Sequence, residues 1–121
     1  MICNLHHVHL FASNLDESLG FYREMFGAEL VFDAEVAGAR NVLIRIGNGH
    51  INFYDQLPKE TGRSAVHHLG IRTDNLAALV AHMEARGVRF RKAITAHNDL
   101  KYVMVQAPDG ILIELFETPG F

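Results

Sequence analysis

A short pattern occurs twice in the chain, and this internal repeat is the feature that most limits the fold. Residues 7–15 read HVHLFASNL and residues 68–76 read HLGIRTDNL, about half of the 121-residue chain apart. Each copy starts at a histidine, alternates apolar and polar side chains as a strand does, and then reaches an Asn-Leu pair suited to a helix start. A module of about 60 residues is only marginally stable alone, so we expect two modules that fold together.

The first copy is typical of a β-α-β-β-β module. A strand over residues 5–12 precedes a helix in which Asn14 can cap the N-terminus, with Glu17 at the capping-box position and Gly27 at the end. Turn residues then separate three further runs with the composition of strands, at residues 29–35, 41–46 and 50–54.

The second copy repeats this order after a polar linker, residues 55–65. A strand over residues 66–72 leads to a helix that Asp74 or Asn75 caps and Gly87 ends. Three more strands are predicted, at about residues 88–94, 101–106 and 111–116.

Two such modules, residues 4–56 and 65–118, predict a single α+β domain over residues 1–121. Each module carries one helix and four strands, so we expect two curved mixed sheets with the helices on their outer faces. The alternation of side chains then assigns one face of every strand to the helix and the other face to an inner, concave surface.

Composition excludes several classes of function. The net charge is −3 and no basic run occurs, so we expect no nucleic-acid partner. No apolar run is long enough to cross a bilayer, and no secretion signal opens the sequence, so we expect no membrane association. The single cysteine, Cys3, cannot form an internal disulfide, which favours the cytoplasm as the location.

The inner face collects the polar residues of four strands. In the first strand Val8 and Leu10 belong to the apolar set under the helix, so the residues between them face inward. The same alternation in the other strands gives the complete inner set: His7, His9, Phe11, His50, Asn52, Tyr54, His68, Gly70, Arg72, Leu112, Glu114 and Phe116.

Glu114 is the most informative residue of this set, because it lies in the middle of the apolar run ILIELF. An unpaired carboxylate is costly to bury there. A barrel-edge position or a salt bridge to Arg72 or Arg45 would reduce the cost. A divalent metal ion held by Glu114, His7 and His68 would remove it more completely, since two imidazoles and one carboxylate form a facial triad with open positions.

The sequence resembles the vicinal oxygen chelate superfamily, which includes glyoxalase I, methylmalonyl-CoA epimerase, fosfomycin-inactivating transferases, extradiol dioxygenases and bleomycin-resistance proteins. The resemblance covers nearly the whole chain. The motifs that carry it are His7 before the NLDESLGFY segment at residues 14–22, His68 before the second Asn-Leu pair, and the PDG turn at residues 108–110 before Glu114.

This resemblance implies a glyoxalase-like fold, a divalent ion (Zn, Ni, Mn, Co or Fe), a small-molecule substrate that chelates it through two neighbouring oxygens, and a homodimer. It implies His7, His68 and Glu114 as metal ligands. The fourth ligand position of the glyoxalase and epimerase branches falls on Asn52, where those enzymes have Glu or Gln. An amide oxygen binds a metal weakly and cannot take up a proton, so the glyoxalase I reaction itself is in question.

Three functions remain open. The leading one is a glyoxalase-like lyase, isomerase or transferase that acts through a metal-bound enolate or alkoxide. The second is an Fe(II) ring-cleaving dioxygenase, for which His97 has a permitted spacing, but Met104 stands where its signature has tyrosine and Tyr102 is two residues early. The third is a non-catalytic binding or resistance protein. The basic cluster of the fosfomycin branch is not identified.

His9 and Glu114 are the predicted catalytic residues. His9 lies two residues from His7 on the same face, where it can move protons or orient His7. His6 and His67 are expected to point away from the cavity. The predicted substrate pocket consists of His9, Phe11, His50, Asn52, Tyr54, Arg72, His97, Tyr102 and Met104.

Overall fold

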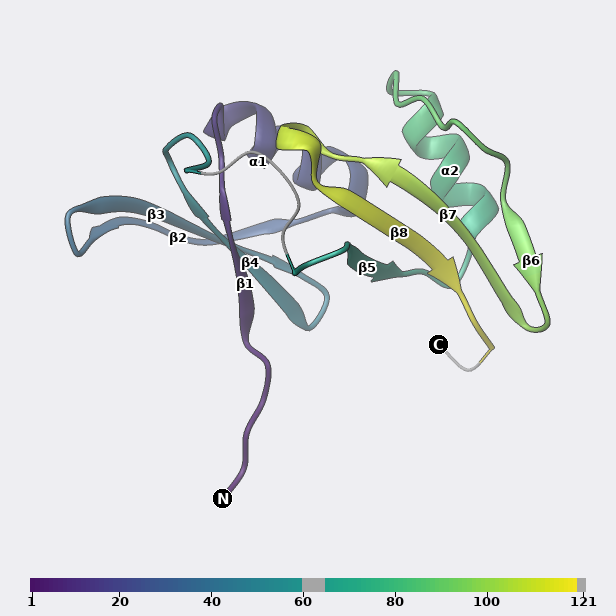
Figure 1. The fold of residues 1–121 in the computed structure, drawn as a ribbon, viewed down its shortest axis with the longest axis horizontal. Helices are drawn as coiled ribbons and strands as arrows, with labels where there is room; N and C mark the ends of the chain where they lie inside the picture. The colour runs from purple at the N-terminus through teal and green to yellow at the C-terminus, as the bar shows by residue number, and fades with distance from the viewer. Residues whose placement is uncertain (60–64, 120–121) are drawn as a thin grey trace. The chain divides into compact units, whose positions relative to one another are not determined.

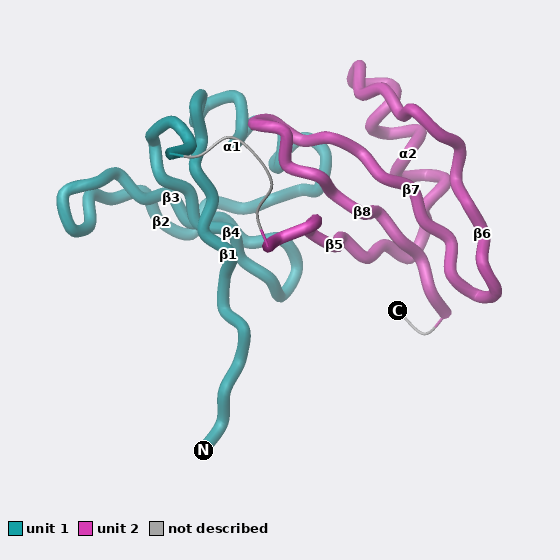
Figure 2. Tube along the Cα trace, in the orientation of Figure 1, with its two compact units in different colours: residues 1–62 teal, residues 63–121 magenta. Residues whose placement is uncertain are grey.

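The computed structural model describes residues 1–59 and 65–119. The chain divides into two compact units, Met1–Gly62 and Arg63–Phe121 (Figure 2). Each unit contains one four-stranded mixed sheet and one α-helix, which confirms the α+β class expected from the repeat.

The first unit contains strands β1 to β4 and helix α1 (Figure 1). The sheet has the order β1-β4-β3-β2, in which β1 is parallel to β4 and the other neighbours are antiparallel. The bounds are β1 His7–Phe11, α1 Leu15–Phe26, β2 Glu29–Val36, β3 Ala39–Ile46 and β4 Gly49–Tyr54.

The second unit repeats this arrangement with the sheet order β5-β8-β7-β6, in which β5 is parallel to β8. A short 3₁₀ turn over Pro108–Gly110 precedes its last strand. The bounds are β5 Leu69–Arg72, α2 Leu76–Glu84, β6 Thr95–His97, β7 Leu100–Gln106 and β8 Leu112–Glu117.

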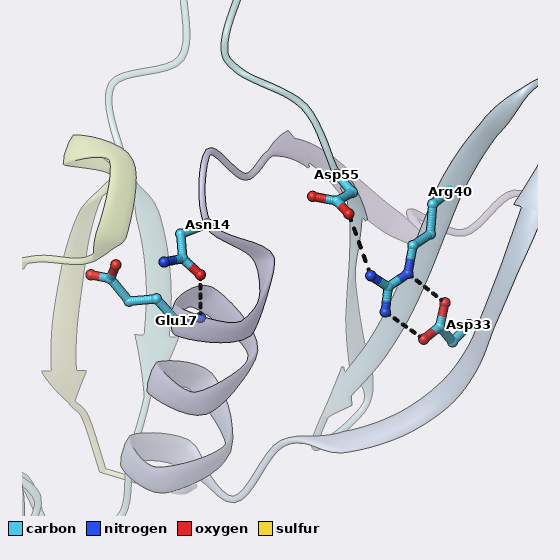
Figure 3. Close-up of polar contacts among 5 residues, drawn as sticks. All are labelled: Asn14, Glu17, Asp33, Arg40 and Asp55. Carbon is cyan, nitrogen blue, oxygen red and sulfur yellow. Dashed lines mark hydrogen bonds and ion pairs between the residues drawn. The ribbon is translucent and has the colours of Figure 1, made fainter.

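Both helices begin at a side-chain cap in the predicted place. The Asn14 side chain accepts a hydrogen bond from the Glu17 backbone N–H at 3.1 Å (Figure 3), and Asn75 accepts one from the Ala78 N–H at 3.0 Å. Asn75, and not Asp74, is therefore the cap of α2. These bonds satisfy amides that the first helical turn leaves without an intrahelical partner.

Each helix covers the predicted apolar face of its sheet. On β4, Ile51 and Phe53 are buried, and the ring of Tyr22 from α1 lies 5.6 Å from the ring of Phe53. On β8, Ile113 and Leu115 are fully buried, and α2 contacts this strand. Burial of one face of each strand leaves the alternate residues for the opposite face.

An ion-pair cluster holds the exposed part of the first sheet together (Figure 3). Arg40 on β3 donates to both carboxylate oxygens of Asp33 on β2, at 3.0 and 2.9 Å, and to Asp55 just after β4 at 3.3 Å. The hydrogen bond from Arg40 lowers the pKa of Asp33. Since all three side chains are exposed, the cluster fixes geometry more than it stabilises the fold.

Two predicted strands differ from the observed ones. The run at 88–94 is not a strand. One edge of β7 pairs with β8, and the partner at its other edge is the shorter β6, which begins only at Thr95. The strand predicted at 66–72 begins at Leu69, which leaves His68 just before it. Residues 60–64 of the predicted linker lie outside the described residues. Among the helices that are described, none has the length and apolar character to cross a membrane.

Candidate metal and substrate site

The predicted inner face of the first unit is present in the pairing of β1 with β4. His7 lies opposite His50, His9 opposite Asn52, and Phe11 opposite Tyr54. Directly paired residues point to the same side of a sheet, so these six side chains share one face. The His9 ring stacks on the Tyr54 ring at a centroid distance of 3.7 Å, which fixes its plane.

Asn52 is buried on this face and only half of its amide is satisfied. Its Nδ2 donates to Oδ1 of Asn41 at 3.3 Å, whereas its Oδ1 has no hydrogen-bond partner. A buried acceptor without a donor is unfavourable by roughly 1–3 kcal/mol. This oxygen therefore suits a ligand that accepts its lone pair, and the predicted fourth metal position is chemically compatible with that role.

The environment of His9 favours its neutral form. Partial burial, followed in importance by the charge of the neighbouring His7, lowers the pKa of His9. A neutral imidazole can accept a proton or coordinate a metal ion.

His6 and His67 each contact the histidine that follows them in the chain, whereas their direction relative to the cavity stays a prediction. Nδ1 of His6 lies 2.9 Å from Nδ1 of His7, and Nδ1 of His67 lies 2.8 Å from Nδ1 of His68. His50 contacts His6 as well, since their rings stack at 4.5 Å and Nδ1 of His50 lies 3.2 Å from the His6 carbonyl oxygen.

In the second unit Glu114 lies on β8 opposite Gly70, and Gly70 is two residues after His68 in the sequence. Its side chain is half-buried, and among the described residues no hydrogen bond or ion pair reaches its carboxylate. Arg45, one predicted salt-bridge partner, pairs instead with Glu29 at 2.5 Å. Arg72, the other, donates to the Pro119 carbonyl oxygen at 3.3 Å. The carboxylate is thus available to a ligand.

Metal-ligand donors are present in both units. Within the described parts of the chain, no three His, Cys, Asp or Glu side chains gather as a metal-binding group. The predicted triad takes His7 from the first unit and His68 and Glu114 from the second, so it remains a prediction about both units together. The donor chemistry fits a divalent ion, because each half supplies unpaired lone pairs on the expected face.

A cavity of about 610 Å³ opens beside β7 in the second unit. Three basic residues of the segment between α2 and β6 line it: Arg89, Arg91 and Lys92. The described residues provide no carboxylate that pairs with any of the three. Met104 and Leu112 contribute apolar wall, and Met104 lies directly opposite Glu114. A volume of this order suits a small organic molecule.

The sequence reading missed this basic cluster. The sequence predicts a strand at about residues 88–94, in which the side chains of RFRK at 89–92 would alternate between two faces. The signal that could have identified them is the density of positive charge directly after the Gly87 turn in an otherwise acidic chain.

The remaining predicted pocket residues lie on the same sheet faces. Tyr102 is half-buried, lines the cavity and lies opposite Phe116. His97 is exposed at the end of β6, two residues from Thr95, which also lines the cavity. A second hollow, in the first unit, has a volume of about 480 Å³ and is lined by His50 and the paired Arg45 and Glu29.

Comparison with known proteins identifies relatives of the whole chain. The uncharacterized protein YwbC of Bacillus subtilis is 25% identical over an alignment of 131 residues, gaps included. The alignment covers 97% of this chain and 99% of that protein. The antibiotic-binding protein TnmS3 from Streptomyces sp. CB03234 has a TM-score of 0.81 at 22% identity, with 97% of each chain covered. The fosfomycin resistance protein FosX from Listeria monocytogenes, solved with Mn(II) and sulfate, has a TM-score of 0.78 at 17% identity and covers 99% of this chain and 96% of its own.

These structural neighbours share the fold. The family model for the Glyoxalase/Bleomycin resistance protein/Dioxygenase superfamily matches residues 4–115, nearly the whole chain. The protein therefore belongs to the glyoxalase/bleomycin resistance protein/dioxygenase superfamily.

Proposed function

We propose that the protein is a metal-dependent enzyme of glyoxalase-like type that acts on a small anionic substrate with two neighbouring oxygens. The observation that carries this proposal is the unpartnered carboxylate of Glu114. It lies mid-strand, opposite Gly70 on one side and Met104 on the other. Met104 in turn lines the basic cavity, so one surface offers a metal ligand beside a site for negative charge.

The proposed metal ligands are His7, His68 and Glu114, with Oδ1 of Asn52 as a weaker fourth donor. When bound, the ion would act as a Lewis acid on the chelated oxygens of the substrate. Two neutral imidazoles and one carboxylate leave a divalent ion with a formal charge of about +1, which still attracts an anion.

The basic cavity supports an anionic substrate. Arg89, Arg91 and Lys92 carry charge that no neighbouring carboxylate neutralises within the described residues. The hollow of the first unit differs in this respect, because Arg45 already pairs with Glu29. Charge-assisted hydrogen bonds to an anionic group can be made in the cavity without first breaking an ion pair.

His9 is the proposed proton-transfer residue. Its ring is held against Tyr54, and its lowered pKa keeps the imidazole ready to accept a proton near neutral pH. The glyoxalase I branch uses a carboxylate for a similar task, and Asn52 cannot replace that carboxylate.

Metal content is the first test. Protein purified under anaerobic conditions without chelator is expected to contain, or to bind, one divalent ion per chain, and His68→Ala is expected to abolish binding. Zinc, nickel, cobalt or manganese with no redox activity supports the proposal. Iron together with catechol-dependent oxygen uptake would instead indicate the dioxygenase. Tight ligand binding that survives both a chelator and His68→Ala would indicate a non-catalytic binding protein.

Substrate charge is the second test. Malate and lactate carry the same chelating 2-hydroxy-carboxylate group, but only malate has a second carboxylate. We expect the metal-loaded protein to bind malate more tightly than lactate in a calorimetric titration. Lys92→Gln should remove about 10-fold of this preference, because one charge-assisted hydrogen bond is lost. Lys101→Gln is the matched control, since Lys101 does not line the cavity. An unchanged preference in Lys92→Gln would contradict the assignment.

A further inference from the structure

The repeat places two adjacent histidines in the same contact in both halves of the chain. His6 meets His7, and His67 meets His68, in each case through the two Nδ1 atoms. The second member of each pair is a proposed metal ligand. Because the two contacts arise in separate units with almost the same distance, they reflect one arrangement that the repeat carries twice.

The geometry of these contacts is that of a linear hydrogen bond. For His6 and His7 the ring centroids are 5.2 Å apart and the Nδ1 atoms 2.9 Å apart; for His67 and His68 the values are 5.1 and 2.8 Å. In both pairs the centroid separation exceeds the nitrogen separation by about the diameter of one imidazole ring. The two Nδ1 atoms thus face one another along the line between the ring centres, as donor and acceptor do.

A hydrogen bond of this kind fixes the tautomer of both rings. One Nδ1 must carry the proton, and the other must offer its lone pair. In a neutral imidazole that donates from Nδ1, Nε2 has no proton and is free to bind a metal ion. In the partner ring that accepts at Nδ1, Nε2 carries the proton and cannot bind.

We propose that His6 and His67 are positioning residues that accept the Nδ1–H of His7 and His68 and so present Nε2 of each to the metal. This inference rests on the proposed function, since it assigns His7 and His68 as ligands. Metal-bound histidines commonly donate a hydrogen bond from the N–H of their second ring nitrogen to a carboxylate, a carbonyl or water. Here a neighbouring imidazole takes that place, and it does so twice.

His50 strengthens the arrangement in the first unit. Its ring lies parallel to the His6 ring, with 10° between the planes, and its Nδ1 lies 3.2 Å from the His6 carbonyl oxygen. The contact with the carbonyl oxygen holds the His50 ring in place, and the stacking of the two rings then restricts how the His6 ring can turn. When His7 binds the metal, His6 therefore loses less side-chain freedom than a histidine without this stacking partner would lose.

The test is a calorimetric titration of the full-length, metal-free protein with Zn²⁺. His6→Leu and His67→Leu remove the acceptor and are each expected to weaken zinc binding about 10–100-fold, the usual effect of losing such a partner. His6→Asn and His67→Asn should retain most of the affinity, because the asparagine Oδ1 can accept where Nδ1 did. His82→Leu, on α2 and outside both pairs, is the control for loss of a histidine.

A spectroscopic readout separates this role from a structural one. In ¹⁵N spectra of the zinc-loaded protein, His7 and His68 should carry the proton on Nδ1 and the metal on Nε2, while His6 and His67 should carry the proton on Nε2. Circular dichroism checks that every variant is folded. A purely structural role would change the melting temperature without changing the tautomers.

The outcomes separate the two proposals. If the unaltered protein binds zinc and the leucine variants bind it equally well, or if His7 and His68 bind through Nδ1, the positioning role is wrong and the proposed function stands. If the unaltered protein binds no divalent ion, the proposed function fails and this role fails with it.

Discussion

The two halves of the protein share a backbone plan but present different chemistry at matching positions. Since β1 pairs with β4 as β5 pairs with β8, Asn52 in the first half corresponds to Glu114 in the second, and His9 corresponds to Gly70. One half thus offers a neutral amide opposite an imidazole, whereas the other offers a carboxylate opposite a residue with no side chain. Both halves keep a pair of adjacent histidines in contact, whereas the polar groups on the neighbouring strands differ.

The two halves also differ in the charged and aromatic groups around the inner face of each sheet. In the first half Arg45 is neutralised by Glu29, and the ring of Tyr54 stacks on His9. In the second half the basic side chains beside the cavity have no acidic partner among the described residues. We infer from this difference that the first half is suited to proton transfer and the second half to binding an anion.

The largest expected effect concerns a core position that the two halves have in common. Phe53 and Leu115 are counterparts that are 1% and 0% exposed. Phe53→Ala should lower the free energy of unfolding by about 3–5 kcal/mol and Leu115→Ala by about 2–5 kcal/mol, through lost apolar burial and a residual cavity. Urea unfolding followed by circular dichroism measures both. If either change were nearly neutral, that strand would not form the core of its half.

The second prediction replaces the carboxylate of Glu114 by an amide, the group that its counterpart Asn52 carries. Loss of a group that only hydrogen-bonds to a metal ligand weakens metal binding by up to roughly 100-fold. Glu114→Gln should weaken it by more, because the only anionic ligand of the proposed set is lost. The charge is removed with little change of shape, so the metal-free protein should unfold at nearly the same urea concentration. Zinc titration and urea unfolding give the two values. Unchanged zinc affinity would exclude Glu114 as a ligand.

The complementary change adds a carboxylate to the first half. Asn52→Asp should destabilise the metal-free protein by about 1–3 kcal/mol, since the donor to Asn41 is lost and a buried charge is left unpaired. Saturating zinc should restore most of this loss if the side chain faces the metal. A loss that zinc does not reverse would place Asn52 outside the metal site.

A smaller effect is expected at the two helix starts, where the halves are alike. Asn14→Ala and Asn75→Ala each remove one side-chain acceptor for a backbone amide and should cost about 1 kcal/mol of stability. Measured by urea unfolding, the two losses should be similar. A clear inequality would show that one helix depends on its cap more than the other, in spite of the same contact.

The smallest effect is the titration of His9, a group that its counterpart Gly70 lacks. In the metal-free protein its NMR titration midpoint should lie below the ordinary value of about 6.5, because burial and then His7 lower its pKa. The unfolded chain binds this proton more readily, so stability should fall as the pH drops through about 6.5. His7→Asn should raise the midpoint only partly, since burial is the larger cause. A complete return to the ordinary value would contradict that order.

Local patterns in the sequence were enough to predict much of the fold. The repeat, the period-two strands at β1, β4 and β8, and the caps at Asn14 and Asn75 depend on residues close together in the chain. The alternation also assigned Glu114 and Asn52 to the faces on which they lie, because a strand leaves each side chain only two directions. The ligand assignment remains a prediction from these faces.

What depends on distant partners could not be read from the sequence. The segment at 88–94 has a composition compatible with a strand, but a strand needs a neighbour. One edge of β7 pairs with β8, and the other edge pairs with Thr95–His97 and not with residues 88–94. For this reason the basic residues of that segment line a cavity and do not join the sheet.

The two modules, their helices and the sheet faces of Asn52 and Glu114 follow from the sequence alone, because periodicity and local hydrogen bonding fix them. Which distant groups meet follows from the tertiary fold alone: the Asn52 amide meets Asn41 and stays half-satisfied, and the basic residues 89, 91 and 92 meet the cavity beside β7. Contacts of this kind depend on distances and angles that a residue's own neighbours in the sequence do not fix.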